Sequence, residues 1–192
     1  MQAFNRYRCV LEDARPTDWK AGKEWYDSAH ERISDAASKA AEHSSLNAEH
    51  LTALFCDAVA VLSPMTDWDR NLAAVDSLVR AYRDDYPDRW KFEVLSRHTA
   101  YNSNAQRALN VLKGEARPSG PKVEAFAANL KGAEHAVTID RHMLDVVDTF
   151  GLKSATGNAI RSCKRAVRMV ATLHDVTPRT AQATIWSYVR RR

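Results

Sequence analysis

Two residues of opposite charge, Lys122 and Asp140, stand eighteen positions apart and could take part in one reaction. Lys122 follows Gly120-Pro121, so it falls in the first turn of a predicted helix. A lysine near a helix N-terminus, in a partly desolvated groove, can act as a nucleophile. Asp140 precedes an apolar helix, and a carboxylate aimed into a cleft can stabilise positive charge that develops on a sugar ring. The simpler interpretations are a lysine that contacts phosphate or solvent and an aspartate that only caps its helix.

The segment Ser119-Gly120-Pro121-Lys122 predicts a tight turn between two helices. A glycine turn lets the backbone approach a phosphate closely, and the helix that follows presents unpaired N–H groups. Such a hairpin can hold one DNA strand without reading its sequence. A plain turn between helices is the alternative interpretation.

A second basic feature is the predicted helix at residues 155–173. Arg161, Lys164, Arg165 and Arg168 have spacings that place them on one face, opposite Ile160, Val167 and Val170. This face could contact DNA phosphates, in which case binding would weaken as salt rises. It could equally be an ordinary solvated face. Together with the hairpin, it favours contact with double-stranded DNA.

The composition is that of an ordinary globular protein. The chain has 192 residues, 45% hydrophobic and 27% charged, and 28 Lys and Arg against 24 Asp and Glu give a net charge of +4. This mild excess permits nucleic-acid binding without requiring it. No apolar run is long enough to cross a membrane, and the N-terminus has no signal-peptide pattern.

Cysteine and histidine usage argues against metals and disulfides. Cys9, Cys56 and Cys163 are odd in number and form no CxxC pair, and Cys56 and Cys163 fit small buried apolar residues. The seven histidines show no zinc-ligand spacing with a third ligand. We therefore expect no metal, no cofactor and a cytoplasmic location. The tryptophans are expected to be core anchors.

Helical periodicity dominates, which predicts an all-α fold of eight or so helices. Helices are expected at 18–42, from Asn47 to near Pro64, after a cap at Thr66 or Asp67, and from a cap at Asn102 or Ser103 to Leu112, with 83–99 irregular or a short helix. Further helices are expected from Pro121 to Leu130, from Asp140 to Gly151, at 155–173 and after Thr177-Pro178. We expect one domain of two lobes, with residues 50–150 forming a hairpin-bearing lobe and residues 1–49 with 151–192 forming a terminal lobe.

Three ordered motifs carry a family resemblance. Gly120-Pro121-Lys122, a helix, and then Val137-Thr138-Ile139-Asp140-Arg141-His142 resemble the hallmark of the helix-hairpin-helix DNA glycosylases, the superfamily of endonuclease III. "YNSNA" at 101–105 and "LSPMTDW" at 62–68 resemble two further segments of that superfamily. The chain is also similar to compact glycosylase-like proteins encoded by bacterial viruses. It has one of the two usual turn glycines and lacks the C-terminal cysteines of the iron–sulfur members.

The resemblance implies an enzyme that swings a damaged or modified nucleotide out of the duplex, and we expect a monomer. Asp140 would stabilise the cationic sugar, and Lys122 would attack C1′. His142 is a candidate to support Asp140 and could equally be a core or surface histidine. DNA would be contacted by Met65, Tyr101, Asn102, Ser103, Ser119, Gly120 and Pro121, with Met65 as a wedge in the gap left by the extruded base. Two alternatives remain open, a DNA-base tailoring enzyme that acts on a modified thymine and a non-catalytic DNA-binding protein.

Overall fold

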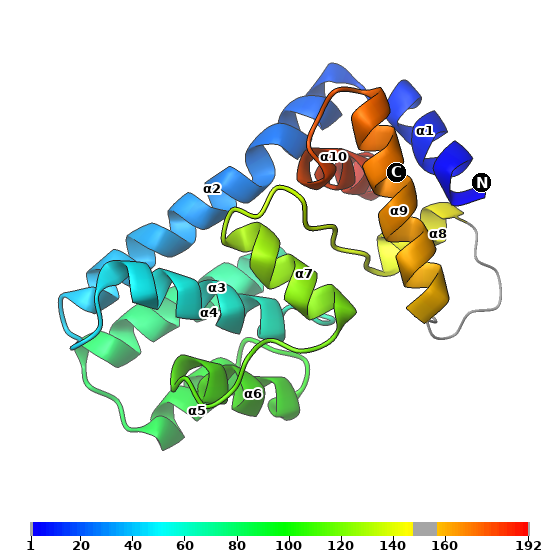
Figure 1. Ribbon diagram of the computed structural model, residues 1–192. Coiled ribbons are helices and arrows are strands. Elements are labelled where there is room, and N and C mark those ends of the chain that lie inside the picture. Colours follow the sequence, from blue (N-terminus) through cyan, green and yellow to red (C-terminus); the bar gives the residue numbers. More distant parts are fainter. Residues whose placement is uncertain (1, 148–156, 192) are drawn as a thin grey trace. The chain divides into compact units, whose positions relative to one another are not determined.

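The fold is all-α, as the periodicity predicts. The computed structural model describes residues 2–147 and 157–191, and these contain ten helices and no strand (Figure 1). The helices are α1 (Gln2–Asp13), α2 (Pro16–Ala41), α3 (Ala48–Leu62), α4 (Trp68–Arg83), α5 (Asp88–Ser96), α6 (Asn102–Leu112), α7 (Pro121–Leu130), α8 (Arg141–Val147), α9 (Gly157–Leu173) and α10 (Pro178–Arg191).

Several helix ends follow from single residues that the sequence identifies. Asn47 caps α3 by accepting a hydrogen bond from the His50 amide at 2.8 Å, and Asp67 caps α4 in the same way. Pro121 is the first residue of α7, where its missing N–H costs nothing. Gly132 follows α7 with a φ of 92°, in the left-handed region that ends helices.

Two other expectations about the helices were wrong, and a third extends beyond the described residues. The helix α1 was not expected, because its charges hide a narrow apolar stripe in which Tyr7 and Leu11 are buried. The cap of α6 is Tyr101, which makes no side-chain cap bond, so Asn102 and Ser103 are not caps. The helix expected to end at Gly151 is described only to Val147, and Gly151 and residues 155–156 lie outside the described residues.

The chain divides into two compact units, each described here by itself. The terminal unit comprises Met1–Ser28 with Ala128–Arg192, and the middle unit comprises Ala29–Ala127. These limits fall at other residues than the lobe limits expected at 49/50 and 150/151, and the lobes stay a prediction. Lys122 belongs to the middle unit and Asp140 to the terminal unit.

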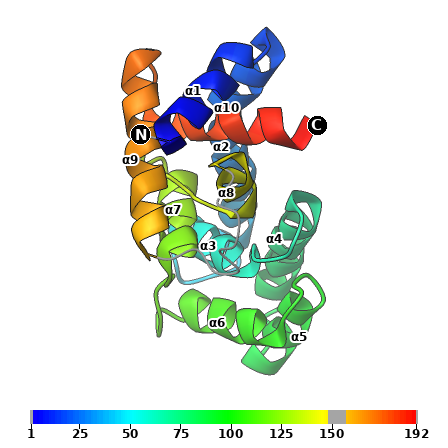
Figure 2. The ribbon, with the colours of Figure 1, turned by 90° about the vertical axis from the view of Figure 1, so that its right-hand side faces the viewer.

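In the terminal unit, α1, α8, α9 and α10 pack on one another (Figures 1 and 2). Their apolar faces meet in one cluster, which excludes water and supplies most of the unit's stabilisation. Its fully buried members include Tyr7, Leu11, Met143, Val167, Val170 and Ile185.

In the middle unit, α3 packs against α4 and α6, and α5 also packs against both α4 and α6. The helix α3 is the most buried of these, because apolar residues occupy nearly every position from Ala58 to Leu62. The core of the middle unit includes Ile33, Leu51, Phe55, Leu62, Val75, Leu78 and Leu95.

Gly22 marks a close approach of α2 and α10 in the terminal unit. A Cβ at this position of α2 would lie 2.0 Å from Thr184 Oγ1 and 2.6 Å from the Thr184 amide nitrogen of α10. Real Cβ atoms do not come this close, and one of the two clashing atoms is backbone. The contact therefore requires glycine within a helix that would otherwise favour alanine.

We expect Gly22→Ala to destabilise the protein by about 2 kcal/mol or more, although alanine has the better helix propensity. The separation of α2 and α10 must increase, which opens gaps around buried Thr184. Urea denaturation monitored by circular dichroism measures the change. The control Lys23→Ala, at the next and exposed position, should stay within about 0.5 kcal/mol of wild type. A Gly22→Ala variant as stable as wild type would contradict the packing described.

Candidate functional site

Asp140 has both carboxylate oxygens engaged within the terminal unit. Oδ1 accepts a hydrogen bond from the Met143 amide at 3.0 Å, so the predicted N-cap of α8 is confirmed. Oδ2 accepts a hydrogen bond from Trp186 Nε1 at 3.2 Å. The side chain is half-buried, so it is held in one direction without being sealed from solvent.

Aromatic rings and one cation surround the indole that holds Asp140. The ring centroids of Trp186 and Trp25 are 5.7 Å apart, and Trp25 packs edge-on against Tyr26. The Arg190 guanidinium lies over the Trp186 ring, 4.7 Å from its centroid. The carboxylate thus lies beside a partly exposed aromatic cluster that carries a positive charge on its outer side.

The start of α8 is fixed by a buried tyrosine of α1. The Tyr7 hydroxyl donates a hydrogen bond to the Met143 carbonyl at 2.8 Å. Tyr7 is fully buried, and burial raises its pKa far above the usual range, so the hydroxyl stays a donor at all working pH values. This contact joins residues 136 positions apart and positions the helix that Asp140 caps.

Asn129, with no exposed surface, orders the backbone that leads to Asp140. Its Nδ2 donates to the carbonyls of Ala133 and Ala136 at 2.9 and 3.1 Å. Its Oδ1 accepts from the Tyr26 and Thr138 hydroxyls at 3.2 and 3.0 Å. The amide therefore ties the loop between α7 and α8 to α2 within this unit.

His142 lies on α8, two residues after Asp140, and is half-buried. Among the described residues, no hydrogen bond joins its ring to Asp140. Support of Asp140 comes instead from Trp186, which the sequence interpretation placed only on the inner face of the last helix. The role assigned to His142 stays a prediction.

The turn before Lys122 has the left-handed glycine that the sequence predicts. Gly120 has a φ of 101°, and Arg107 of α6 donates to the Ser119 carbonyl and hydroxyl at 3.1 and 2.8 Å. The Gly120 amide, however, donates to Glu124 Oε1 at 3.0 Å. This amide was expected to face a phosphate, and it is instead engaged by a carboxylate of its own helix. Lys122 is half-buried in the first turn of α7.

The other candidate DNA contacts of the middle unit are exposed. Met65 is 69% exposed and has a φ of 60°, an unusual backbone conformation for a residue with a side chain. Tyr101 is 53% exposed, and Asn102 and Ser103 are exposed in the first turn of α6. These side chains are available to a partner, and their role stays a prediction.

The basic face of α9, formed by Arg161, Lys164, Arg165 and Arg168, has the orientation that the spacing predicts. Cys163, Val167 and Val170 are buried on the opposite side of the helix. The described part of α9 contains no acidic residue. Arg161, Arg165 and Arg168 are exposed and form no salt bridge with the described carboxylates. Their charge is therefore open to an anionic partner from solvent.

The described residues contain neither a metal-ion site nor a membrane-spanning helix. Residues 2–147 and 157–191 contain no group of three or more His, Cys, Asp or Glu side chains that could hold a metal ion. No helix in this part of the chain is both long and apolar enough to span a bilayer. Cys56 and Cys163 are buried, as the sequence indicates, whereas Cys9 is exposed.

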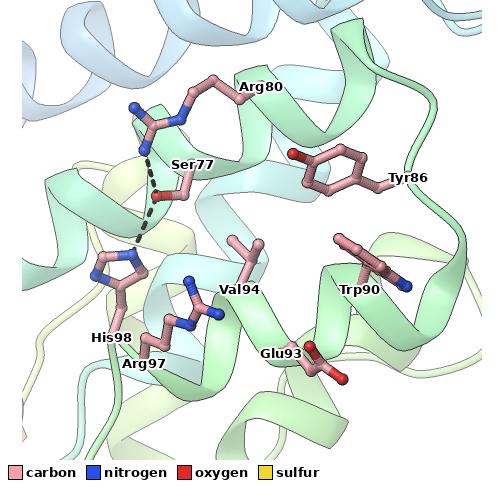
Figure 3. Close-up of a pocket in the computed structure, with 8 residues that line it drawn as sticks. All are labelled: Ser77, Arg80, Tyr86, Trp90, Glu93, Val94, Arg97 and His98. Carbon is pink, nitrogen blue, oxygen red and sulfur yellow. Dashed lines mark hydrogen bonds between the residues drawn. The ribbon is translucent and has the colours of Figure 1, made fainter.

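The middle unit contains a pocket that the sequence interpretation missed. It has a volume of about 410 Å³ (Figure 3). One side, the basic wall, is formed by Ser77, Arg80, Arg97 and His98, and the opposite side, the aromatic wall, is formed by Tyr86 and Trp90, with Glu93 and Val94 completing the lining.

The pocket arises from helical spacing on two successive helices. On α4, Ser77 and Arg80 are one turn apart. On α5, Trp90 and Val94 share one face, and Arg97, the C-cap residue of α5, continues that face. Asp85 has a φ of 46°, which lets the chain reverse direction after α4. The Tyr86 amide then donates a hydrogen bond to the Ala81 carbonyl at 2.8 Å. Trp90 is 55% exposed, so the expectation that it anchors the core was wrong.

Ser77 connects two groups of the basic wall. Its Oγ accepts a hydrogen bond from Arg80 Nη2 at 3.0 Å and lies 3.0 Å from His98 Nε2. Burial, and then the charges of Arg70, Arg80 and Arg97, lower the pKa of His98 below its usual range. The imidazole is therefore neutral at pH 7.

We expect His98 to make folding stability depend on pH. Because its pKa is lower in the folded than in the unfolded protein, its contribution is complete above about pH 6.5, the unfolded value, and is lost as pH falls through the folded value. The free energy of unfolding of His98→Gln should therefore fall less than that of wild type between pH 7.5 and 5. Urea denaturation across this range measures the slope. The exposed control His135→Gln should keep the wild-type slope. Parallel profiles for wild type and His98→Gln would contradict the lowered pKa.

Comparison with known families covers almost the whole chain. Residues 3–192 match DUF7178, described as a family of unknown function. The chain belongs to this family. No curated protein and no solved structure matches it. A function for this DUF7178 member must therefore be inferred from its own side-chain contacts.

Proposed function

We propose that this DUF7178 protein is a DNA glycosylase-like enzyme with a two-lobed helix-hairpin-helix arrangement, in which Asp140 and Lys122 act on an extruded nucleotide. The observation that carries the proposal is the environment of Asp140, whose two oxygens accept hydrogen bonds from the Met143 amide and the Trp186 indole. A carboxylate that only caps a helix needs the first of these bonds and not the second.

The two hydrogen bonds suit an electrostatic role for Asp140. Two donors on different elements hold the half-buried carboxylate, one for each oxygen. They also hold the charge in one direction before any substrate binds, which is what stabilises a developing cation most effectively. The partly exposed rings of Trp25 and Trp186 offer an apolar surface for the sugar or base beside that charge.

In the proposed reaction, the glycosidic bond of the extruded nucleotide breaks and its electron pair leaves with the base, which takes up a proton. Asp140 stabilises the positive charge left on the sugar. The Lys122 amine then forms a bond to C1′ through its lone pair and releases a proton, and opening of the sugar ring gives a Schiff base. This intermediate permits elimination of the 3′ phosphate and strand scission.

Contact with the DNA backbone is assigned to the basic face of α9. Exposed arginines on a helix without acidic residues attract phosphates and release counterions on binding. The Gly120 amide already donates a hydrogen bond to Glu124. The basic face of α9 is therefore a stronger candidate for the phosphate contact than the turn before α7.

Borohydride trapping tests the enzymatic proposal. The protein is incubated with duplexes that carry oxidised, deaminated or 5-substituted pyrimidines, and covalent protein–DNA adducts are resolved on denaturing gels. We expect an adduct with wild type and none with Lys122→Ala, because the amine is the bonding atom. Asp140→Asn keeps an N-cap but loses the charge, and adduct formation should slow about 100-fold or more. The control Lys131→Ala, an exposed lysine just after α7, should react like wild type.

The other outcomes identify the alternatives. Nucleosides with an altered base that is still attached would replace the glycosylase proposal by a base tailoring enzyme. Unchanged DNA with salt-sensitive binding would leave a non-catalytic DNA-binding protein. An adduct that persists in Lys122→Ala would contradict the assigned nucleophile.

Met65 allows stability and DNA distortion to be separated. Its left-handed backbone strains any residue with a Cβ, so Met65→Gly should be about 1 kcal/mol more stable than Met65→Ala. Both variants lack the wedge, so we expect both to extrude a nucleotide less well, measured by fluorescence of 2-aminopurine in the duplex. Full extrusion in both variants, or equal stabilities of the two, would contradict the corresponding half of this prediction.

A further inference from the structure

We propose that the pocket of the middle unit binds a 5′-phosphorylated nucleoside, with the base on the aromatic wall and the phosphate on the basic wall. This inference does not depend on the glycosylase proposal, because all the pocket residues lie in the middle unit and none of them is Lys122.

Within the described part of the chain, the arginines of the basic wall form no close ion pair, and Asp84 acts on Arg80 only at longer range, since the main partner of Asp84 is Arg83. Among the described residues, neither Arg80 nor Arg97 forms a salt bridge. The one acidic residue of the lining, Glu93, lies 3.4 Å from Arg89 Nε. The pocket therefore favours an anion over a cation or a neutral ligand.

The arrangement of donors fits a phosphate better than a planar carboxylate. Arg80 reaches the pocket from α4, and Arg97 reaches it from the end of α5, so their guanidinium groups approach from different directions (Figure 3). Each guanidinium has five N–H donors, and Arg80 donates one hydrogen bond to the Ser77 hydroxyl. Donors from two directions match the several oxygens of a tetrahedral group.

The aromatic wall explains why the anion should carry a planar ring. Trp90 is 55% exposed and meets Tyr86 with ring centroids 5.7 Å apart. An indole left this exposed offers a flat apolar surface, on which a nucleic-acid base stacks irrespective of its identity. Val94 lies between the two walls (Figure 3), and the volume of about 410 Å³ is within the range of small-molecule sites.

Two kinds of molecule could supply such a ligand, a free nucleotide and the 5′-phosphorylated end of a DNA strand. Both present a phosphate monoester next to a base. Because Trp90 is exposed, the pocket is open enough for either.

Calorimetric titration of the full chain with dTMP, thymidine and inorganic phosphate tests the site. We expect dTMP to bind at least about tenfold more tightly than either fragment, because only dTMP uses both walls. Trp90→Ala and Arg97→Gln should each weaken dTMP binding about tenfold, through lost stacking and a lost charged hydrogen bond. Both side chains are exposed, so these variants should fold, as circular dichroism can verify. The control Arg6→Gln, exposed on α1, should bind like wild type.

A second arm distinguishes the two sources by comparing oligonucleotides with 5′-phosphate and 5′-hydroxyl ends. Preference for the 5′-phosphate end that is lost in Arg97→Gln assigns the site to strand ends, and binding of dTMP alone assigns it to free nucleotides. Equal affinity for dTMP and either fragment, or variants that bind dTMP like wild type, would overturn the proposal. Lys122→Ala and Asp140→Asn should bind dTMP normally, so failure of the glycosylase test leaves this result interpretable.

Discussion

The buried amide of Asn129 is the constraint on which the geometry of the terminal unit depends. The loop between α7 and α8 forms no regular structure, so its backbone carbonyls need partners away from water. Asn129 supplies two N–H donors to that loop and accepts from the hydroxyls of Tyr26 and Thr138. Burial raises the pKa of Tyr26 to about 12, which keeps its hydroxyl a donor at neutral pH. Replacement of such an amide by an apolar residue would leave several buried polar groups unpaired.

The position of Asp140 follows from this network and from two helices that are distant in sequence. The ordered loop brings the chain to Asp140, Tyr7 of α1 then holds the first turn of α8, and Trp186 of α10 holds the carboxylate. Helices near the two ends of the sequence are thus needed to position Asp140. A further contact supports this unit, because Arg191 near the C-terminus pairs with buried Asp18 through two bonds of 3.1 and 2.9 Å.

The sequence predicts what depends on local chemistry. Caps such as Asn47 and Asp67, the glycine turns and the buried face of α9 follow from residue type and spacing within a few positions. The bond between Trp186 and Asp140 joins residues 46 positions apart, and that between Tyr7 and Met143 joins residues 136 apart. No local pattern encodes such pairings. The pocket of the middle unit shows an intermediate case, since the spacing of Trp90, Val94 and Arg97 was visible but requires α5 to be recognised as a helix.

The distribution of charge decides more than the net charge of +4. Several cations are neutralised where they lie, as Arg32 is by Asp76, Arg179 by Asp27 and Lys113 by Asp88 and Glu115. Other arginines form no salt bridge with the described carboxylates, and five of them lie on the basic face of α9 (Arg161, Arg165 and Arg168) and on the basic wall of the pocket (Arg80 and Arg97). A chain with a small excess of positive charge can therefore present two basic surfaces, because the local arrangement of charges and not their sum sets the field at each surface. One surface is a stripe along a helix, and the other is an open pocket beside an aromatic wall. This difference in shape is why we propose a backbone contact for the first and a nucleotide site for the second.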